Sequence, residues 1–426
     1  MIRIIDSIKD SGFLKKLLDR SQFEFEEVNK VVDEILFNIR ERKDKALKEY
    51  TLKFDKVEID DFLVSKEEID DAFENIDDNL KNDLLRAKEN IEKYHTKQLK
   101  SSYTLHDGED IILGQIIRPI EKVGIYVPGG SAAYPSTVLM NAVPAKIAGV
   151  KEIVMITPPN KEGKIKDSVL VAASIAGVDK IYKVGGAQGI GALTFGTESI
   201  PKVSKIVGPG NIYVAMAKKK VAGYVGIDMI AGPSEILIIA DEHANPKYIA
   251  ADLISQAEHD EMAASILVTD SQKIAKKVNE ELKIQVEMLE RKEIIKKSLK
   301  NYGAIIITSS MNESIKIANE VAPEHLEILT RTPFDLYKQV KNAGAIFLGE
   351  FSPEPLGDYF AGPNHTLPTS STSKFASPLG VEDFLKKTSL IYYSKEALMK
   401  SKDSIIRIAE DEGLTAHANS IKVRFE

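Results

Sequence analysis

Short apolar segments alternate with helical patterns through the middle of this chain, and that alternation limits the folds it can adopt. In a first series the apolar segments are residues 123–127, 152–157, 180–184 and 204–207. A second series has apolar segments at residues 235–240, 265–269, 304–308 and 344–349. Strands that alternate with helices in this way are typical of βαβ units, which build parallel sheets with helices on both faces. We therefore predict an α/β fold with two parallel-sheet units.

The segments that flank or interrupt these two series have other patterns. Residues 1–100 are polar with apolar residues at helical spacing, so we expect helices there, with His95 and His106 on the surface. A long charged helix is expected at residues 271–300. Residues 350–380 are rich in Pro, Gly, Ser and Thr and predict a long loop of a kind that is commonly functional or disordered. Residues 381–426 predict a small helical unit with a tail.

The composition excludes several classes of protein. A chain of 426 residues is too long for one ordinary core, so two or more domains are expected. No apolar run approaches the roughly 20 residues that cross a bilayer, and Asp6 interrupts the first apolar run earlier than in a signal peptide. The net charge of −7 gives no basic footprint for nucleic acid. We interpret the only candidate patch, Lys218 to Lys220, as a solvated helix end.

The chain has no cysteine, and this absence limits its chemistry. Disulfides, a thiolate nucleophile, a cysteine-ligated metal and a cysteine-ligated iron–sulfur cluster are all excluded. An aldehyde could not be captured covalently by a thiol. We expect a cytoplasmic location, with no membrane and no nucleic acid as partner.

Three glycine-rich loops follow strands of the first series, after Val127, Val184 and Val207. In open parallel sheets, ligands bind beyond the carboxyl ends of the strands. Glycine lets backbone donors approach phosphate closely, and a helix N-terminus favours an anion. No GxGxxG motif is present, so each loop alone could be a tight turn. Together, three such loops at one sheet edge favour a nucleotide or another anion as ligand.

Polar side chains of catalytic or ligand type are spread over the second half of the chain. Gln256 and His259 lie three apart and share a helix face, which fits half of a metal site or an ordinary polar helix end. Glu324 and His325 form a candidate acid/base pair, or belong to an exposed loop. The remaining candidates are isolated: Asp358 and His365 in the long loop, Glu412 and His417 in the tail, and His243 after a strand, where a plain loop role is expected.

The candidate nitrogen and oxygen ligands are Gln256, His259, Asp358 and His417. Zinc accepts imidazole and carboxylate, although glutamine is an uncommon ligand and no HExxH motif is present. The local patterns leave open a metal-dependent hydrolase, a dehydrogenase and a non-catalytic sugar- or nucleotide-binding protein. They do not show whether the four ligands converge.

A set of motifs, taken together, resembles the histidinol dehydrogenase family. The motifs occur in the family's order, and only residues 44–47 and 54–55 match in the first hundred residues. The matching segments are residues 118–120, 123–130, 185–188, 208–211, 231–235, 255–260, 322–327, 357–359, 362–369 and 412–417.

This resemblance implies oxidation of L-histidinol to L-histidine through L-histidinaldehyde, with one zinc ion per subunit and two NAD reduced. It implies Gln256, His259, Asp358 and His417 as zinc ligands, and Tyr126, Gln188 and Asn211 as NAD contacts. The implied substrate contacts are Ser234, Gln256, His259, His325, Asp358, Glu412 and His417. The family is expected to form homodimers in which the tail completes the partner's site.

Two residues carry the implied chemistry. His325 suits the base that takes the hydroxyl proton while hydride leaves to NAD, and Glu324 suits the activation of water for the aldehyde step. These roles need no cysteine, because water and not a thiol would add to the aldehyde. The metal would chiefly orient the substrate.

With the resemblance, we expect two Rossmann-like parallel-sheet domains with small helical N- and C-terminal segments. The expected boundaries are residues 1–20 for an N-terminal helical segment, 21–123 with 235–378 for the metal and substrate domain, 124–234 for the NAD domain, and 379–426 for a small C-terminal domain and tail.

Overall fold

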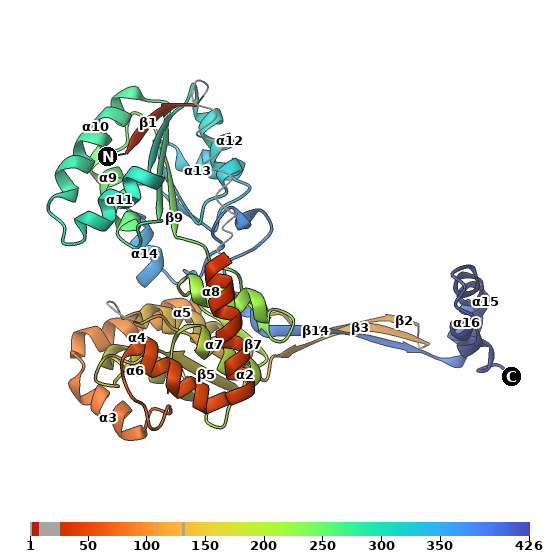
Figure 1. Ribbon diagram of the computed structural model, residues 1–426. Helices are drawn as coiled ribbons and strands as arrows, with labels where there is room; N and C mark the ends of the chain where they lie inside the picture. The colour runs from red at the N-terminus through yellow and green to blue at the C-terminus, as the bar shows by residue number, and fades with distance from the viewer. Residues whose placement is uncertain (1, 8–25, 109, 130–132) are drawn as a thin grey trace. The chain divides into compact units, whose positions relative to one another are not determined.

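The computed structural model describes residues 2–7, 26–108, 110–129 and 133–426 and shows a mixed α/β fold (Figure 1). The chain divides into two compact units. The first comprises Met1–Gln98 and Glu121–Phe384, and the second comprises Leu99–Ile120 and Leu385–Glu426. Two parallel sheets belong to the first unit, and an antiparallel sheet belongs to the second. Within the described ranges, no helix has both the length and the apolar character needed to span a membrane.

The first parallel sheet has five strands in the order β6-β5-β4-β7-β8. Its central strands are buried on both faces, which explains their continuous apolar sequences. Ile125 of the central strand lies opposite Met155 on one side and Val207 on the other. The strands are β4 (Lys122–Tyr126), β5 (Glu152–Thr157), β6 (Lys180–Lys183), β7 (Lys205–Val207) and β8 (Gly226–Ile227).

Helices from two parts of the sequence cover this sheet. Four of them connect its strands: α5 (Pro135–Ala148), α6 (Asp167–Ile175), α7 (Gly186–Phe195) and α8 (Ile212–Val221). Three more precede the sheet: α2 (Glu26–Asp55), α3 (Lys66–Asn75) and α4 (Asp78–His95), with the short η2 (Thr96–Gln98) after them. Helix α2 packs on α7 and α8, α3 on α6, and α4 on α5 (Figure 1).

This packing corrects the expected boundary at residue 123. Residues 21–123 were expected to join residues 235–378, but Ile39 and Leu47 of α2 share a buried core with Ile156 and Leu193 of the five-stranded layer. An apolar helix face shows that a helix is buried, but not which sheet it covers. His95 is also buried rather than on the surface, and its Nδ1 atom lies 2.8 Å from Oε1 of Gln98.

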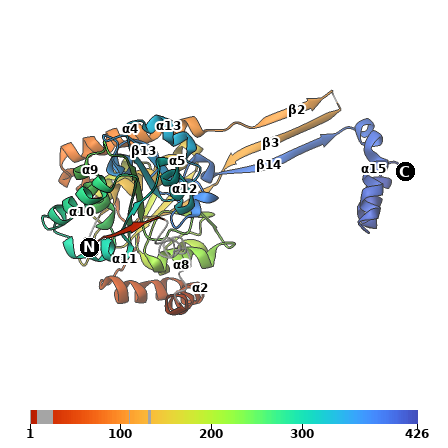
Figure 2. The same ribbon diagram turned by 90° about the horizontal axis from the view of Figure 1, so that it is seen from above.

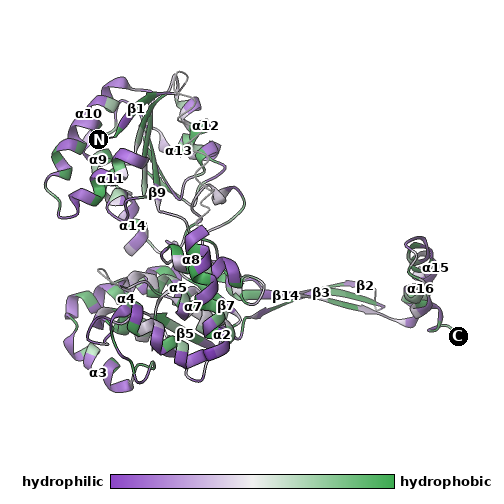
Figure 3. Cartoon of the chain, in the orientation of Figure 1, coloured by the Kyte–Doolittle hydropathy of each residue, from purple (hydrophilic) through white to green (hydrophobic). Residues whose placement is uncertain are grey.

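The second parallel sheet has six strands in the order β1-β11-β10-β9-β12-β13. Figure 3 shows hydrophobic strands inside this layer and mainly hydrophilic outer surfaces on helices such as α10. The strands are β1 (Arg3–Asp6), β9 (Glu235–Ala240), β10 (Ala264–Thr269), β11 (Ala304–Ile307), β12 (His325–Leu329) and β13 (Ala345–Leu348). Around them lie α9 (Pro246–Ala257), α10 (Gln272–Val286), α11 (Lys292–Tyr302), α12 (Met311–Val321), α13 (Pro333–Leu336) and η3 (Tyr337–Gln339).

Three expectations for these segments are wrong or lie outside the described residues. Residues 1–20 were expected to be helical, but Arg3–Asp6 forms an edge strand parallel to β11, and residues 8–25 are not described (Figure 2). The long helix expected at 271–300 is two helices. The long loop expected at 350–380 contains α14 (Glu354–Tyr359) and η4 (Thr372–Lys374), followed by η5 (Val381–Phe384).

The second unit contains a three-stranded antiparallel sheet and two helices. Strand β3 (Ile111–Pro119) lies between β2 (Tyr103–Asp107) and β14 (Leu385–Tyr393), and α15 (Lys395–Asp411) and α16 (Thr415–Lys422) follow. The segment 379–426 was expected to be helical with a tail, but it contributes a nine-residue strand. Its strand partner comes from residues far away in the sequence, so no local pattern revealed the pairing.

The two parallel sheets share one connection pattern. Taking the strands of each in chain order, both have the order 3-2-1-4-5, with β1 added at one edge of the larger sheet. The order reverses between β4 and β7 in one sheet and between β9 and β12 in the other. Such a reversal is where open α/β sheets usually bind ligands, beyond the carboxyl ends of the strands.

Candidate active site

The three residues expected to contact NAD lie at the carboxyl edge of the five-stranded sheet. Tyr126 ends β4, is buried, and accepts a hydrogen bond from the backbone nitrogen of Gly186 at 3.3 Å. Burial raises the pKa of Tyr126 to about 12, so its phenol stays neutral. Gln188 is buried in the first turn of α7. The structure therefore groups loops that end different strands, as the sequence predicted.

Asn211 caps the helix that follows the third glycine-rich loop. Its Oδ1 atom accepts hydrogen bonds from the backbone nitrogens of Tyr213 (3.1 Å) and Val214 (3.2 Å). The cap uses the side-chain oxygen and leaves the amide nitrogen free to donate to a ligand. A helix N-terminus with a free donor suits an anion such as a phosphate.

Gln256 and His259 lie at the end of α9, at the amino end of the six-stranded sheet. Gln256 is 1% exposed, and neither its Oε1 nor its Nε2 atom has a hydrogen-bond partner in the described chain. An unpaired buried amide costs free energy unless a ligand completes it. The ligand atoms of His259, Glu354 and Asp358 all lie within 4.8 Å of one another. This donor set, next to an orphaned amide oxygen, fits a cation with nitrogen and oxygen ligands.

Glu354 is a member of this group that the sequence analysis missed. It starts α14, is 2% exposed, and accepts a hydrogen bond from Oγ of Ser255 at 3.0 Å. Burial raises the pKa of Glu354 to about 8 and that of Asp358 to about 6. Their spacing of four residues places both carboxyls on one helix face. The spacing is visible in the sequence, but it brings the two carboxyls together only if the segment is helical. We had predicted a loop there.

Glu324 and His325 lie at the start of β12 and are buried, at 6% and 4% exposure, so the exposed-loop alternative is wrong. The backbone of Glu235, the first residue of β9, contacts both side chains. The backbone nitrogen of Glu235 donates to Oε2 of Glu324 at 2.9 Å, and its backbone oxygen lies 3.0 Å from Nδ1 of His325. Burial raises the pKa of Glu324 well above its usual value and lowers that of His325 to about 3. Nε2 of His325 lies 3.8 Å from Oδ1 of Asp358, which links the pair to the ligand group.

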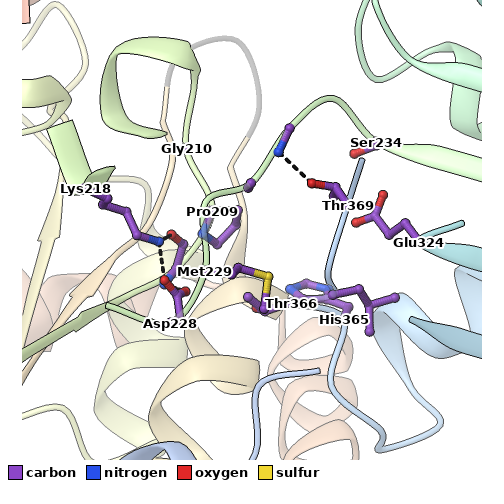
Figure 4. Close-up of a pocket in the computed structure, with 14 residues that line it drawn as sticks. Pro209, Gly210, Lys218, Asp228, Met229, Ser234, Glu324, His365, Thr366 and Thr369 are labelled. Carbon is purple, nitrogen blue, oxygen red and sulfur yellow. Dashed lines mark hydrogen bonds and ion pairs between the residues drawn. The ribbon is translucent and has the colours of Figure 1, made fainter. Parts of the chain in front are cut away.

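A pocket of about 130 Å³ lies between the glycine-rich loop after β7 and Glu324 (Figure 4). Ser234 and Glu324 line it, together with Gly208, Pro209 and Gly210. Its other lining residues are Lys218, Asp228, Met229, Ala231, Gly232, His365, Thr366, Leu367 and Thr369. The pocket is therefore bordered by the third glycine-rich loop, by Ser234, which was expected to bind substrate, and by Glu324 of the candidate acid/base pair.

Two residues that line the pocket have more contacts in the structure than their local sequence indicated. His365, isolated in the sequence, is held by two contacts: its Nδ1 atom lies 3.1 Å from the backbone oxygen of Asp358, and its Nε2 atom lies 3.3 Å from Oγ1 of Thr137. Lys218 was interpreted as part of a solvated helix end, but it is 2% exposed and pairs with Asp228. Within the lysine run, the helical periodicity turns this one side chain inward.

Glu412 and His417 belong to the second unit. Glu412 caps the C-terminal end of α15, His417 lies in α16, and both side chains are exposed. Their expected roles in substrate and metal binding stay predictions. His243 is exposed in the loop after β9, as expected.

Comparisons with known proteins agree on one family. A family model described as histidinol dehydrogenase matches residues 18–425. A protein of Clostridium acetobutylicum named histidinol dehydrogenase is 60% identical over 428 residues, which cover 100% of this chain and 99% of the relative. One of Caldanaerobacter subterraneus with the same name is 58% identical over 429 residues, 100% and 99% of the two chains. The crystal structure of histidinol dehydrogenase from Elizabethkingia anophelis has a TM-score of 0.93 and 39% identity, over 99% of this chain and 98% of that one.

Proposed function

The chain belongs to the histidinol dehydrogenase family, and from this membership we propose a two-step, zinc-dependent oxidation of L-histidinol to L-histidine at the site described above. It is an NAD-dependent oxidoreductase of histidine biosynthesis. The observation that carries the proposal is the shared pocket: Glu324 and Ser234 line it together with the loop after β7.

In the first step the carbinol carbon gives a hydride to NAD and its hydroxyl gives up a proton, which leaves an aldehyde. His325 takes the proton at Nε2, the ring atom that has no hydrogen-bond partner in the described chain. Burial lowers the pKa of this imidazole to about 3, so the ring is neutral and Nε2 is unprotonated before the reaction. NAD leaves as NADH with the histidinaldehyde still in place.

In the second step water adds to the aldehyde, and the hydrate gives a second hydride to another NAD. Glu324 takes a proton from the attacking water, which its carboxyl can do once it is ionised. Because burial raises the pKa of Glu324, its carboxylate is a stronger base than an exposed one. The product is the carboxylate of L-histidine.

One zinc ion per subunit is proposed, held by Gln256, His259, Asp358 and His417. The orphaned amide of Gln256 and the convergence of His259, Glu354 and Asp358 support this set. When bound, the metal would orient the imidazole and amine of the substrate. The substrate contacts proposed with it are Ser234, Gln256, His259, His325, Asp358, Glu412 and His417.

The remaining proposals concern cofactor, assembly and location. Tyr126, Gln188 and Asn211 are proposed to contact NAD, and the shared 3-2-1-4-5 strand order supports two Rossmann-like domains. We propose a homodimer in which Glu412 and His417 complete the partner's site, since both are exposed in the second unit. A cytoplasmic location stays a prediction.

The test is a stoichiometric assay with purified, zinc-supplied protein at mildly alkaline pH. L-histidinol and excess NAD should give two NADH for each histidine formed. A ratio of one would contradict the aldehyde step, and no NADH at all would overturn the assignment. Reactions without histidinol provide the control.

A further inference from the structure

A buried ion pair lies under the loop that follows β7. Lys218 of α8 and Asp228, just after β8, have side chains that are 2% and 1% exposed, and their charged groups are in contact. The ammonium of Lys218 also donates to the backbone oxygen of Gly208 at 2.8 Å, and the backbone nitrogen of Gly208 donates to Oδ2 of Asp228 at 2.8 Å (Figure 4). Both backbone polar groups of one glycine are thus held by one pair of charges.

Gly208, the glycine that the pair holds, packs closely against the end of β4. Its φ angle of 111° is in the region that favours glycine, and a Cβ atom there would overlap the backbone oxygen of Tyr126. Two residues on, a Cβ atom at Gly210 would lie 3.1 Å from the ring of Tyr126 and would overlap Val214. The loop is therefore packed directly on Tyr126, and it leads into Asn211, the cap of α8.

Stability alone is a weak reason to bury two charges. Removing an ammonium and a carboxylate from water is costly, and well-packed apolar residues of similar size often serve as well or better. What apolar residues cannot supply is directional hydrogen bonds to a backbone amide. Lys220, two residues along the same helix, pairs with Asp33 at the surface, and that pair holds no loop.

We propose that Lys218 and Asp228 are positioning residues for the cofactor: they fix the loop from Gly208 to Asn211 so that Asn211 and Tyr126 are presented to NAD. This inference rests on the proposed function, in which those two residues contact NAD. Neither charge touches the reacting atoms. Loss of the pair should therefore weaken NAD binding while substrate and metal binding stay intact.

The deciding variant is the double change Lys218→Met with Asp228→Asn, which removes both charges and leaves no unpaired ion. Its dissociation constant and KM for NAD should rise about tenfold, as expected when the charged hydrogen bond from Lys218 to the binding loop is lost. The KM for histidinol and the zinc content should stay within about twofold of wild type. Lys220→Met, which breaks the exposed pair with Asp33, is the matched control and should bind NAD normally.

Several outcomes would overturn the inference. Wild-type NAD affinity in the folded double variant would do so, and so would an equal loss in Lys220→Met. If the double variant does not fold, Lys218→Met decides by the same titration, because it removes the hydrogen bond from the ammonium to the Gly208 oxygen. Unchanged affinity there also overturns the inference. Wild-type protein that binds no NAD would instead refute the proposed function.

Discussion

The Nδ1 atom of His325 lies 3.0 Å from the backbone oxygen of Glu235, and this contact determines which ring nitrogen can act as a base. A carbonyl oxygen only accepts hydrogen bonds, so Nδ1 must carry the ring proton. Nε2 is then unprotonated, and it is buried without a partner in the described chain. The same backbone residue also binds the carboxyl of Glu324, so the two candidate catalytic groups share one support.

Replacement of the two groups should affect the two oxidations differently. His325→Ala should slow both, by roughly 10²–10⁴-fold, because it removes a general base. Glu324→Gln should slow mainly the oxidation of histidinaldehyde, since only that step needs activated water. Rates measured from histidinol and from histidinaldehyde would separate the effects. His243→Ala, which changes an exposed histidine, is the control, and equal losses from both substrates in Glu324→Gln would contradict the division.

The rate of aldehyde oxidation should rise with pH. Because burial raises the pKa of Glu324 well above its usual value, this carboxyl is protonated at low pH and cannot take a proton from water. Ionisation at higher pH creates the base, so the rate climbs through the raised pKa. Single-turnover rates from histidinaldehyde against pH would show the climb, and Glu324→Gln should flatten it. A rate that falls over the same range would refute this role.

Gln256→Ala should lower the zinc content of the purified protein. Both polar atoms of the Gln256 amide are buried without a hydrogen-bond partner in the described chain. Loss of a metal ligand should weaken metal binding at least as much as the roughly 10–100-fold loss that is typical when a residue supporting a ligand is replaced. Metal analysis after dialysis against a dilute chelator would measure this. Gln285→Ala, at a half-buried glutamine of α10, is the control. Full retention of zinc would remove Gln256 from the ligand set.

Asp55→Asn should stabilise the protein at pH 8 and have little effect at pH 4. Burial raises the pKa of Asp55 from 3.8 to about 6, and one of its oxygens is buried without a hydrogen-bond partner among the described residues. The folded state therefore binds more protons between these values, and the wild-type free energy of unfolding falls as pH rises through that window. Because Asp55 is only partly buried, solvent screening reduces the effect, and the gain at pH 8 should be on the order of 2 kcal/mol. Denaturant unfolding at both pH values tests this, and equal effects at pH 4 and pH 8 would contradict it.

Mixing two inactive variants should restore activity if the tail completes a partner's site. Gln256→Ala and His417→Ala each damage every site of their own homodimer. In a mixed dimer, one site has both residues intact, so random reassociation of a symmetric dimer should give roughly a quarter of wild-type activity. Activity is measured after the variants are unfolded and refolded together. No recovery, with mixed dimers shown to form, would place Gln256 and His417 of one chain in the same site.

The family predicted from the motifs is confirmed, and so is the α/β fold with parallel sheets. Local sequence could indicate the fold because buried parallel strands are apolar along their whole length. Turns and helix caps also need particular residue types, which mark where the elements begin and end. Asn245 caps α9 and Pro246 is its first residue, as local sequence alone would indicate, and Gln256 lies at the opposite end of that helix. The pair Glu324 and His325 was also visible, because neighbouring residues need no fold to bring them together.

Only the tertiary structure decided which distant segments meet. The helical pattern of α2 shows one buried face, but its burial against α7 and α8 depends on shape complementarity that no local pattern encodes. Lys218 and His95 looked like surface residues because burial is a property of the neighbours. From the sequence we expected ligands beyond the carboxyl ends of the parallel strands, whereas Glu324 and His325 lie at the amino end of β12. The sequence by itself determined the elements and the chemical groups, and packing between remote segments determined the site.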